Sequence, residues 1–318
     1  MSTDFSTNLV SVIIPVHNRP DELRRAIHSV ITQTHQNFEV LVMDDASETD
    51  LASVVQQFND SRIRIFHHEK KSNANVMRNE GLKRAKGQFI ALLDSDDEYL
   101  PDHISTKLKE LDESGADGVY GSSFIDDGSK RAYTPSREMV SNLTAVEYLL
   151  TIGFAPTPSW VIRTDKAREI MFDETLHRHQ DYDFFVRFEK KFRWHTSWHP
   201  GIVIHWRSGE KRQRHPGSEI QFVRKNASDI SPRIYADYHL TQLGLYFLEK
   251  APSDIISYYR YESKRYVMQL SFLDYCSMYP QRKGPAAFLQ NWLGFTWLIL
   301  IRKFMKPHEP VVPAVIKP

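Results

Sequence analysis

An apolar run of strand length, residues 89–93, ends in Asp94-Ser95-Asp96-Asp97, and this segment most constrains the fold of the chain. Three carboxylates this close together repel one another unless a positive charge neutralises them. A divalent cation is the simplest such charge, and oxygen ligands suit Mg²⁺ or Mn²⁺. In an extended chain Asp94 and Asp96 would point the same way and Asp97 the other. The segment therefore predicts an Asp-x-Asp metal site at a strand end, where open α/β sheets bind ligands.

The first 120 residues alternate between strand and helix patterns. Residues 10–15, 38–43 and 88–93 are apolar runs of strand length, and helical spacing follows Pro20 and Ser72-Asn73. Such alternation indicates βαβ units and a mainly parallel sheet. We therefore expect an α/β fold, a Rossmann-like, mainly parallel sheet flanked by helices.

The later sequence predicts a different organisation. The alternation becomes less regular after about residue 121, and from about residue 219 the chain is helical and rich in tyrosine and leucine. We expect a catalytic domain over residues 1–218 and a C-terminal helical extension over residues 219–306. The last segment, 307–318, contains four prolines and should be a flexible tail.

Composition excludes several classes of protein. The net charge of +1 gives no overall field that would favour nucleic acid, so we expect no nucleic-acid partner. The single cysteine, Cys276, excludes an intrachain disulfide and a thiolate zinc cluster, which fits the cytoplasm. The N-terminus lacks the apolar core of a signal peptide. No stretch reaches the roughly 20 apolar residues of a membrane-spanning helix.

Two further acidic pairs could carry chemistry. Asp44 and Asp45 end the strand pattern of residues 38–43, so Asp45 could face the same crevice as the Asp-x-Asp pair. A carboxylate there can accept a hydrogen bond from a nucleoside N–H or a ribose hydroxyl, or it can cap the next helix. Asp181 and Asp183 begin an apolar, aromatic helix, where the helix dipole alone would favour acidic residues.

Five blocks in one order resemble glycosyltransferase family 2, the inverting enzymes with the GT-A fold. The blocks are residues 12–18, 42–47, 75–81, 93–97 and 180–183. The resemblance covers roughly residues 9–207. It implies that a nucleotide-sugar is held by Pro15, Val16, Asn18, Asp45, Arg78, Asp94 and Ser95. Within this set Asp45 would bind the base, typically uracil.

The resemblance also implies the metal and the catalytic base. Asp94 and Asp96 match the motif that grips the ribose and the diphosphate-bound Mn²⁺ or Mg²⁺. Asp181 matches the general base, although the preceding Gln180 replaces the usual glutamate and Asp183 is an alternative. His205 could approach the metal or the diphosphate, or it could be a structural residue on an apolar strand.

These roles imply a metal-dependent inverting glycosyltransferase. It would transfer a sugar from a nucleotide-sugar, typically a UDP-sugar, to a hydroxyl of a saccharide or lipid-linked saccharide by single displacement. The family's usual setting is bacterial surface-polysaccharide or lipopolysaccharide synthesis. One alternative is a sugar nucleotidyltransferase, but residues 16–21 lack the glycine of a triphosphate loop. Another is a non-catalytic sugar-nucleotide-binding protein, which the intact aspartates disfavour.

The segment 288–301 predicts a contact outside the catalytic domain. It places Trp292 and Trp297 among aliphatic residues, and Arg302, Lys303 and Lys306 follow. This pattern suits a helix lying in a membrane interface. A helix packed on the catalytic domain, or a contact in a homo-oligomer, is the alternative. The membrane interpretation would place the protein in the cytoplasm, peripheral on the cytoplasmic face of the inner membrane.

Overall fold

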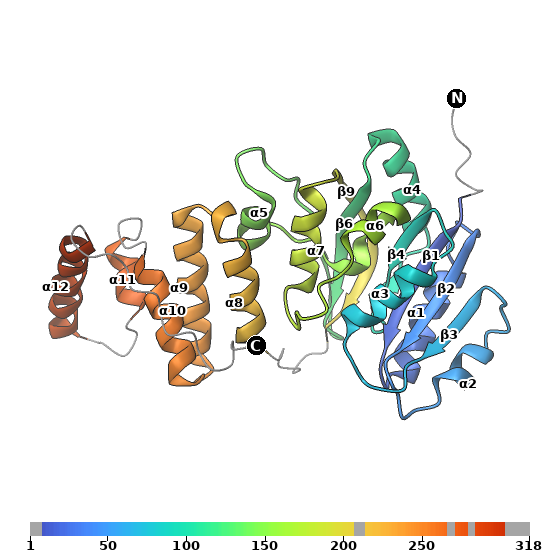
Figure 1. Cartoon of the computed structure of the whole chain (residues 1–318), viewed down its shortest axis with the longest axis horizontal. Helices are drawn as coiled ribbons and strands as arrows, with labels where there is room; N and C mark the ends of the chain where they lie inside the picture. Colours follow the sequence, from blue (N-terminus) through green and yellow to red (C-terminus); the bar gives the residue numbers. More distant parts are fainter. Residues whose placement is uncertain (1–7, 207–213, 266–270, 279–283, 303–318) are drawn as a thin grey trace. The chain divides into compact units, whose positions relative to one another are not determined.

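The structure, a computed structural model, describes residues 8–206, 214–265, 271–278 and 284–302. The chain forms two compact units, residues 1–214 and 215–318 (Figure 1). The predicted flexible tail, 307–318, lies outside the described residues.

Unit 1 is built on a nine-stranded sheet. Its strand order is β3 (Ile63–His67), β2 (Phe38–Asp44), β1 (Val10–Val16), β4 (Phe89–Leu92), β8 (Val161–Arg163), β6 (Gly118–Asp126), β9 (Trp194–His205) and β5 (Glu98–Tyr99), with β7 (Arg131–Thr134) paired to β6. The four strands β3, β2, β1 and β4 are parallel, and so are β6 and β9. Strands β5, β7 and β8 join antiparallel. This α/β architecture agrees with the predicted fold class.

Helices cover both faces of the parallel strands, which is why β1 and β2 are buried along their whole length. Helices α1 (Pro20–Ile31), α2 (Leu51–Gln56) and α4 (His103–Ser114) share one apolar core with alternate residues of β1. Helix α3 (Ala74–Arg84) packs on the opposite face beside α6 (Thr164–Ile170). There Gly81 allows close approach, because a Cβ at this position would lie 2.5 Å from Ile13 Cγ2.

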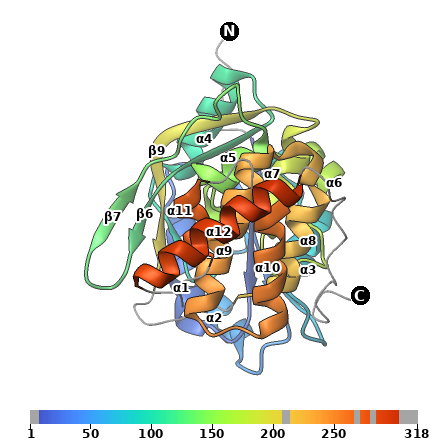
Figure 2. The ribbon, with the colours of Figure 1, turned by 90° about the vertical axis from the view of Figure 1, so that its left-hand side faces the viewer.

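A buried aromatic cluster fixes the second half of unit 1. Trp160 is fully buried, and its ring centroid lies 5.4 Å from those of Phe184 and Trp194. Phe184 belongs to α7 (Gln180–Glu189), which also contacts α5 (Ala145–Thr151). This packing holds the N-terminal turn of α7, and with it Asp181, against the sheet. Strands β6 and β7 form an extended hairpin (Figure 2).

Unit 2 is helical, as expected. It contains α8 (Pro216–Lys225), α9 (Pro232–Leu248), α10 (Ser253–Arg265), α11 (Phe272–Ser277) and α12 (Pro285–Arg302). Two buried hydrogen bonds tie α9 to its neighbours: Tyr246 Oη donates to Glu219 Oε2 at 2.9 Å and Tyr235 Oη to Glu262 Oε2 at 3.1 Å. No helix in the described part of the chain is long and apolar enough to cross a membrane.

A buried histidine in unit 1 should make stability depend on pH. His103 is fully buried and stacks on Tyr99, and neither ring nitrogen has a hydrogen-bond partner among the described residues. Burial, with Lys107 nearby, lowers the pKa of His103 well below 6.5. The unfolded chain therefore binds one more proton below about pH 6.5, so this site loses about 1.4 kcal/mol of folding free energy per pH unit as pH falls.

The variant His103→Phe keeps the aromatic stack and removes the titrating group. Denaturant unfolding between pH 7.5 and 5.5 should show a smaller loss of stability for this variant than for the unsubstituted chain. The exposed His28, replaced by glutamine, is the control. Equal pH slopes for the unsubstituted chain and His103→Phe would contradict this account.

Candidate active site

A cavity of about 570 Å³ opens at the carboxyl ends of β1, β2 and β4. This is the point in the sheet where the order reverses, because β1 has β2 on one side and β4 on the other. We call it the nucleotide cavity. Its lining includes Pro15, Val16, Asp45, Arg78, Asp94, Ser95 and Asp96. These predicted site residues therefore come together, although they are distant in sequence.

Asp45 is a buried carboxylate at the edge of the nucleotide cavity. Its Oδ1 accepts hydrogen bonds from the backbone N–H and the hydroxyl of Ser72, both at 2.7 Å. These bonds fix the loop that precedes α3. Asp45 is thus held in a defined position beside the cavity.

Residues 94–97, which follow β4 after Leu93, form a tight turn closed by a 3.0 Å hydrogen bond from Asp97 N–H to the Asp94 carbonyl. The alternation expected of an extended chain therefore does not apply, because β4 ends at Leu92. Asp94 and Asp96 are still the accessible pair, with side chains 34% and 37% exposed. Asp97 is buried and accepts from the His205 N–H at 3.0 Å. Burial, followed by the charges of Asp94 and Asp96, raises the pKa of Asp97 well above its ordinary value.

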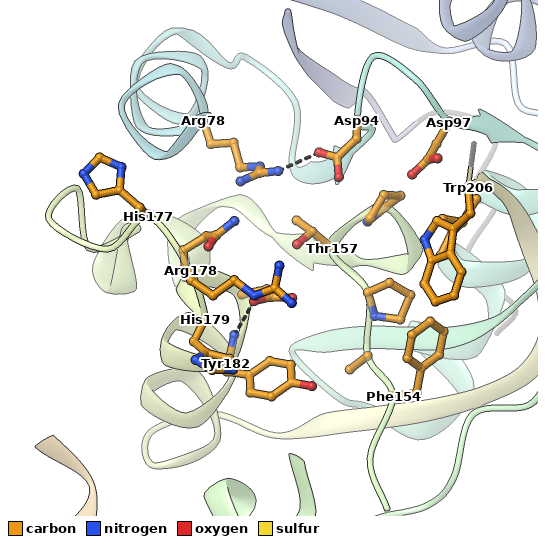
Figure 3. Close-up of a pocket in the computed structure, with 16 residues that line it drawn as sticks. Arg78, Asp94, Asp97, Phe154, Thr157, His177, Arg178, His179, Tyr182 and Trp206 are labelled. Atoms are coloured by element: carbon orange, nitrogen blue, oxygen red, sulfur yellow. Dashed lines mark hydrogen bonds and ion pairs between the residues drawn. The ribbon is translucent and has the colours of Figure 1, made fainter. Parts of the chain in front are cut away.

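Two arginines neutralise the accessible pair. Arg78 Nη2 donates to Asp94 Oδ1 at 2.6 Å (Figure 3), and Arg19 Nη1 pairs with Asp96 Oδ2. Arg78 is almost fully buried, and its guanidinium carbon lies 5.4 Å from the centroid of the Phe172 ring. Each carboxylate of the predicted metal pair therefore has its own cation.

The donor set fits a hard divalent cation with an open coordination sphere. Asp94 and Asp96 supply carboxylate oxygens on one turn, as Mg²⁺ or Mn²⁺ prefers. The described residues contain no group of three or more histidine, cysteine or acidic side chains close enough to hold a metal alone. Phosphate oxygens would then complete the coordination, which is the usual arrangement for Mg²⁺ at nucleotides.

Asn18 and His205 lie at a neighbouring cavity of about 670 Å³, which also includes Arg19 and Asp96. We call it the side cavity. Asn18 Oδ1 accepts from the Glu48 N–H at 2.8 Å, so it connects the loops after β1 and β2. The His205 ring nitrogen Nε2 lies 3.3 Å from Glu98 Oε1. Both residues line the side cavity and not the nucleotide cavity.

Asp181 lines a third cavity of about 360 Å³, which shares Arg78 and Asp94 with the nucleotide cavity. We call it the catalytic cavity. In Figure 3, Phe154 and Trp206 face Arg178 and Tyr182 across it. The shared residues mean that a molecule bound in the nucleotide cavity would border the space beside Asp181.

Asp181, the predicted general base, lies in an environment that shifts its pKa. Burial raises the pKa of Asp181, and the Tyr182 N–H, 3.0 Å from Oδ1, and the charge of Arg78 act in the opposite direction. His179, the N-cap residue of α7 two positions before Asp181, has a left-handed backbone with φ 58°, which is strained for a non-glycine residue. Burial also lowers the pKa of His179 to about 3, so this neighbour is neutral.

Asp183, the alternative base, is held in a buried ion pair. Its side chain is 1% exposed, and Oδ2 accepts from Arg187 Nε at 2.7 Å. Arg187 Nη2 also donates to the Met171 carbonyl at 2.7 Å. This ion pair joins α7 to the end of α6 and leaves Asp183 outside the residues that line the three cavities.

Comparison with known proteins identifies the family. Residues 11–198, more than half of the chain, match the family model Glycosyl transferase family 2. The chain belongs to this family. Amylovoran biosynthesis glycosyltransferase AmsB of Erwinia amylovora is 31% identical over 57% of this chain and 64% of its own length. Putative colanic acid biosynthesis glycosyl transferase WcaA of Escherichia coli is 30% identical over 56% of this chain and 65% of its own length. The family 2 chain thus spans slightly less than two thirds of both relatives.

A solved structure confirms the fold. S. aureus TarS 1-349 in complex with UDP-GlcNAc superimposes with a TM-score of 0.67, covering 96% of this chain and 94% of that chain at 20% identity. The superposition supports the predicted GT-A fold with its C-terminal helical extension. At 20% identity, the superposition shows only that the two chains share a fold.

Two asparagines of this family 2 chain have a role that the sequence did not reveal. Asn75 Nδ2 donates to the carbonyls of Asp173 and Leu176, at 3.0 and 2.7 Å. The amide of Asn79 donates to the Phe172 carbonyl at 3.0 Å and accepts from the Phe172 N–H at 2.8 Å. These bonds fasten α3 to the loop that leads to Asp181. The sequence does place Asn75 and Asn79 one helical turn apart on either side of Arg78, and this spacing could have indicated their shared role.

Proposed function

We propose that this family 2 chain is a metal-dependent inverting glycosyltransferase that uses a nucleotide-sugar, with UDP as the nucleotide. The observation that carries the proposal is the shared boundary of the two cavities at Arg78 and Asp94. Asp45 borders the cavity on one side of this boundary and Asp181 on the other. The two adjoining cavities would then hold the nucleoside and the diphosphate on one side of the boundary and the acceptor on the other.

The chain's residues would divide the reaction between them. Asp45 would accept a hydrogen bond from the base, and Arg78 would donate to the diphosphate. Asp94 and Asp96 would hold Mn²⁺ or Mg²⁺, which stabilises the charge that develops on the leaving diphosphate. Asp181 would take the proton of an acceptor hydroxyl in the catalytic cavity as that oxygen attacks the anomeric carbon. One displacement of this kind inverts the anomeric configuration.

Uracil as the base rests on the family resemblance around Asp45. The acceptor class, a saccharide or lipid-linked saccharide of a bacterial surface polysaccharide, is supported by the names of the two relatives. Phe154 and Trp206 give the catalytic cavity aromatic surfaces on which a sugar ring can pack. Replacement of Trp206 would then change acceptor affinity and leave donor affinity intact.

Contact with a lipid surface through α12 is a second part of the proposal. One side of α12 packs on α11, where the Tyr275 and Phe295 ring centroids are 5.5 Å apart. A stripe of large apolar residues on α12 is 49–64% exposed: Phe288, Leu289, Trp292, Leu293, Trp297 and Leu300. The helix carries no acidic residue, and Arg302 ends it. Such a helix suits an anionic membrane surface, here the cytoplasmic face of the inner membrane.

The pair Trp292→Ala and Trp297→Ala should weaken binding to phosphatidylglycerol vesicles at least tenfold, since each tryptophan contributes roughly 1.5–3 kcal/mol when buried. Co-sedimentation of the full chain measures this. Leu248→Ala, an exposed apolar residue on α9, is the control. Unchanged vesicle binding by the double variant would contradict the membrane proposal. If the unsubstituted chain formed a dimer that the double variant lost, the stripe would instead be a contact with a second copy of the chain.

The enzymatic part is tested by nucleotide release. The full chain with Mn²⁺ should release UDP from UDP-sugars, and saccharide acceptors should increase the rate. If the chain released nucleotide only from sugars linked to a different nucleotide, the UDP assignment would be wrong. The transferase class would still hold.

A further inference from the structure

Arg19 lies where two cavities meet. It is the N-cap residue of α1, and it lines both the nucleotide cavity and the side cavity. Asp96 lines the same two cavities, and the Arg19–Asp96 ion pair stands between them. Arg19 thus pairs with the predicted metal ligand Asp96 at the boundary of the two cavities.

The two arginines that pair with the Asp94 and Asp96 carboxylates differ in how firmly they are held. The Arg78 side chain is 4% exposed, packs on Phe172 and pairs with Asp94. The Arg19 side chain is 44% exposed and its partner Asp96 is 37% exposed. An exposed ion pair contributes little free energy, because water and salt screen it. The Asp94 pair is therefore fixed, and the Asp96 pair can exchange partners at small cost.

Charge balance favours the release of Arg19 from Asp96 when metal and nucleotide bind. A divalent cation on Asp96 repels the guanidinium of Arg19, which must then move from the carboxylate. A nucleoside diphosphate carries more negative charge than one divalent cation neutralises, and an arginine binds phosphate oxygens through paired N–H donors. A diphosphate in the nucleotide cavity would offer Arg19 such a partner within the same cavity.

We propose that Arg19 exchanges Asp96 for the donor diphosphate when metal and nucleotide bind together. The proposal rests on the metal site of the proposed function. Before binding, Arg19 competes with the metal for Asp96, so the metal alone binds weakly. After binding, Arg19 contributes to diphosphate affinity. Arg19 thereby makes the binding of metal and nucleotide interdependent, which disfavours a metal-loaded site without donor.

The test measures Mn²⁺ and UDP binding to the full chain and to Arg19→Ala. Free Mn²⁺ is followed by electron paramagnetic resonance, and UDP by titration calorimetry in saturating Mn²⁺. Without UDP, the variant should bind Mn²⁺ about two- to fivefold more tightly, the range expected for loss of an exposed ion pair. With Mn²⁺, the variant should bind UDP about tenfold more weakly, because a charged hydrogen bond is lost.

Arg24→Ala is the matched control. Arg24 lies on α1, its side chain is also 44% exposed, and it pairs with Asp21 outside the three cavities. Both affinities should stay unchanged in this variant. Unchanged or weaker Mn²⁺ affinity in Arg19→Ala would overturn the exchange while leaving the metal site intact. No Mn²⁺ binding to the unsubstituted chain, even with UDP, would overturn the metal site and the exchange with it.

Discussion

Asp181→Asn should lower the rate of sugar transfer by about 10²–10⁴-fold, the contribution of a positioned general base. The amide cannot take the proton of the acceptor hydroxyl, whereas its size and its contact with the Tyr182 N–H are conserved. UDP affinity in Mn²⁺ should stay within twofold, because Asp181 lines only the catalytic cavity. Steady-state transfer and titration calorimetry give the two measurements.

The pH profile offers an independent readout of the same residue. Because burial raises the pKa of Asp181, transfer should fall on the acidic side at a pH above the ordinary value of 3.8. The rate falls at low pH because Asp181 becomes protonated and can no longer act as a base. The residual rate of Asp181→Asn should therefore lack this decrease. A fully active Asp181→Asn would move the base elsewhere. Asp183→Asn should chiefly lower stability, since it breaks the buried pair with Arg187.

Asp96→Ala should have the second large effect, on metal-dependent nucleotide binding. Loss of one of two protein ligands should weaken UDP binding in Mn²⁺ by more than about tenfold, the order of a lost charged hydrogen bond or ligand contact. With EDTA present, the variant should no longer bind UDP more weakly than the unsubstituted chain. Titration calorimetry with and without EDTA measures both.

A surface aspartate provides the control for this measurement. Asp165 is 70% exposed, pairs with Lys166 and lies outside the three cavities. Asp165→Ala should leave UDP affinity unchanged in both conditions. If Asp96→Ala bound UDP in Mn²⁺ as tightly as Asp165→Ala, the metal assignment to Asp96 would be wrong.

The first half of the fold was predictable because its strands are buried on both faces. Strands β1, β2 and β4 are short apolar runs followed by turn residues; α1 begins with Pro20, and Asn73 caps α3. Local sequence decides such elements. Because parallel strands end at one edge, Asp45 and the Asp-x-Asp turn could also be placed together.

The second half was harder to predict, because tertiary packing decides it. Strand β9 runs from Trp194 to His205 and contains Pro200 and Gly201, which interrupt any strand pattern in the sequence. It is paired with β6 on one side and with β5 on the other. Gly201 is required there, since a Cβ would lie 2.1 Å from His103 Nδ1. A contact between residues so far apart leaves no local pattern.

The candidate site likewise combines residues that the sequence predicted with contacts that it did not predict. Motif order indicated Asp45, Asp94 and Asp181, whose positions follow from strand ends and one helix start. The ion pairs of Arg19 and Arg78 depend on side chains that approach from other elements. The position of His205 at the side cavity follows from the pairing of β9 with β5 and β6, which the sequence did not predict.

The most direct test of the central claim is acceptor-dependent UDP release from UDP-sugars, measured with Mn²⁺ and again after EDTA, with the product's anomeric configuration determined by nuclear magnetic resonance. A metal-dependent inverting glycosyltransferase should release UDP only with Mn²⁺ or Mg²⁺ and should form a product of inverted configuration. Release that persists unchanged in EDTA, or a product of retained configuration, would contradict the account.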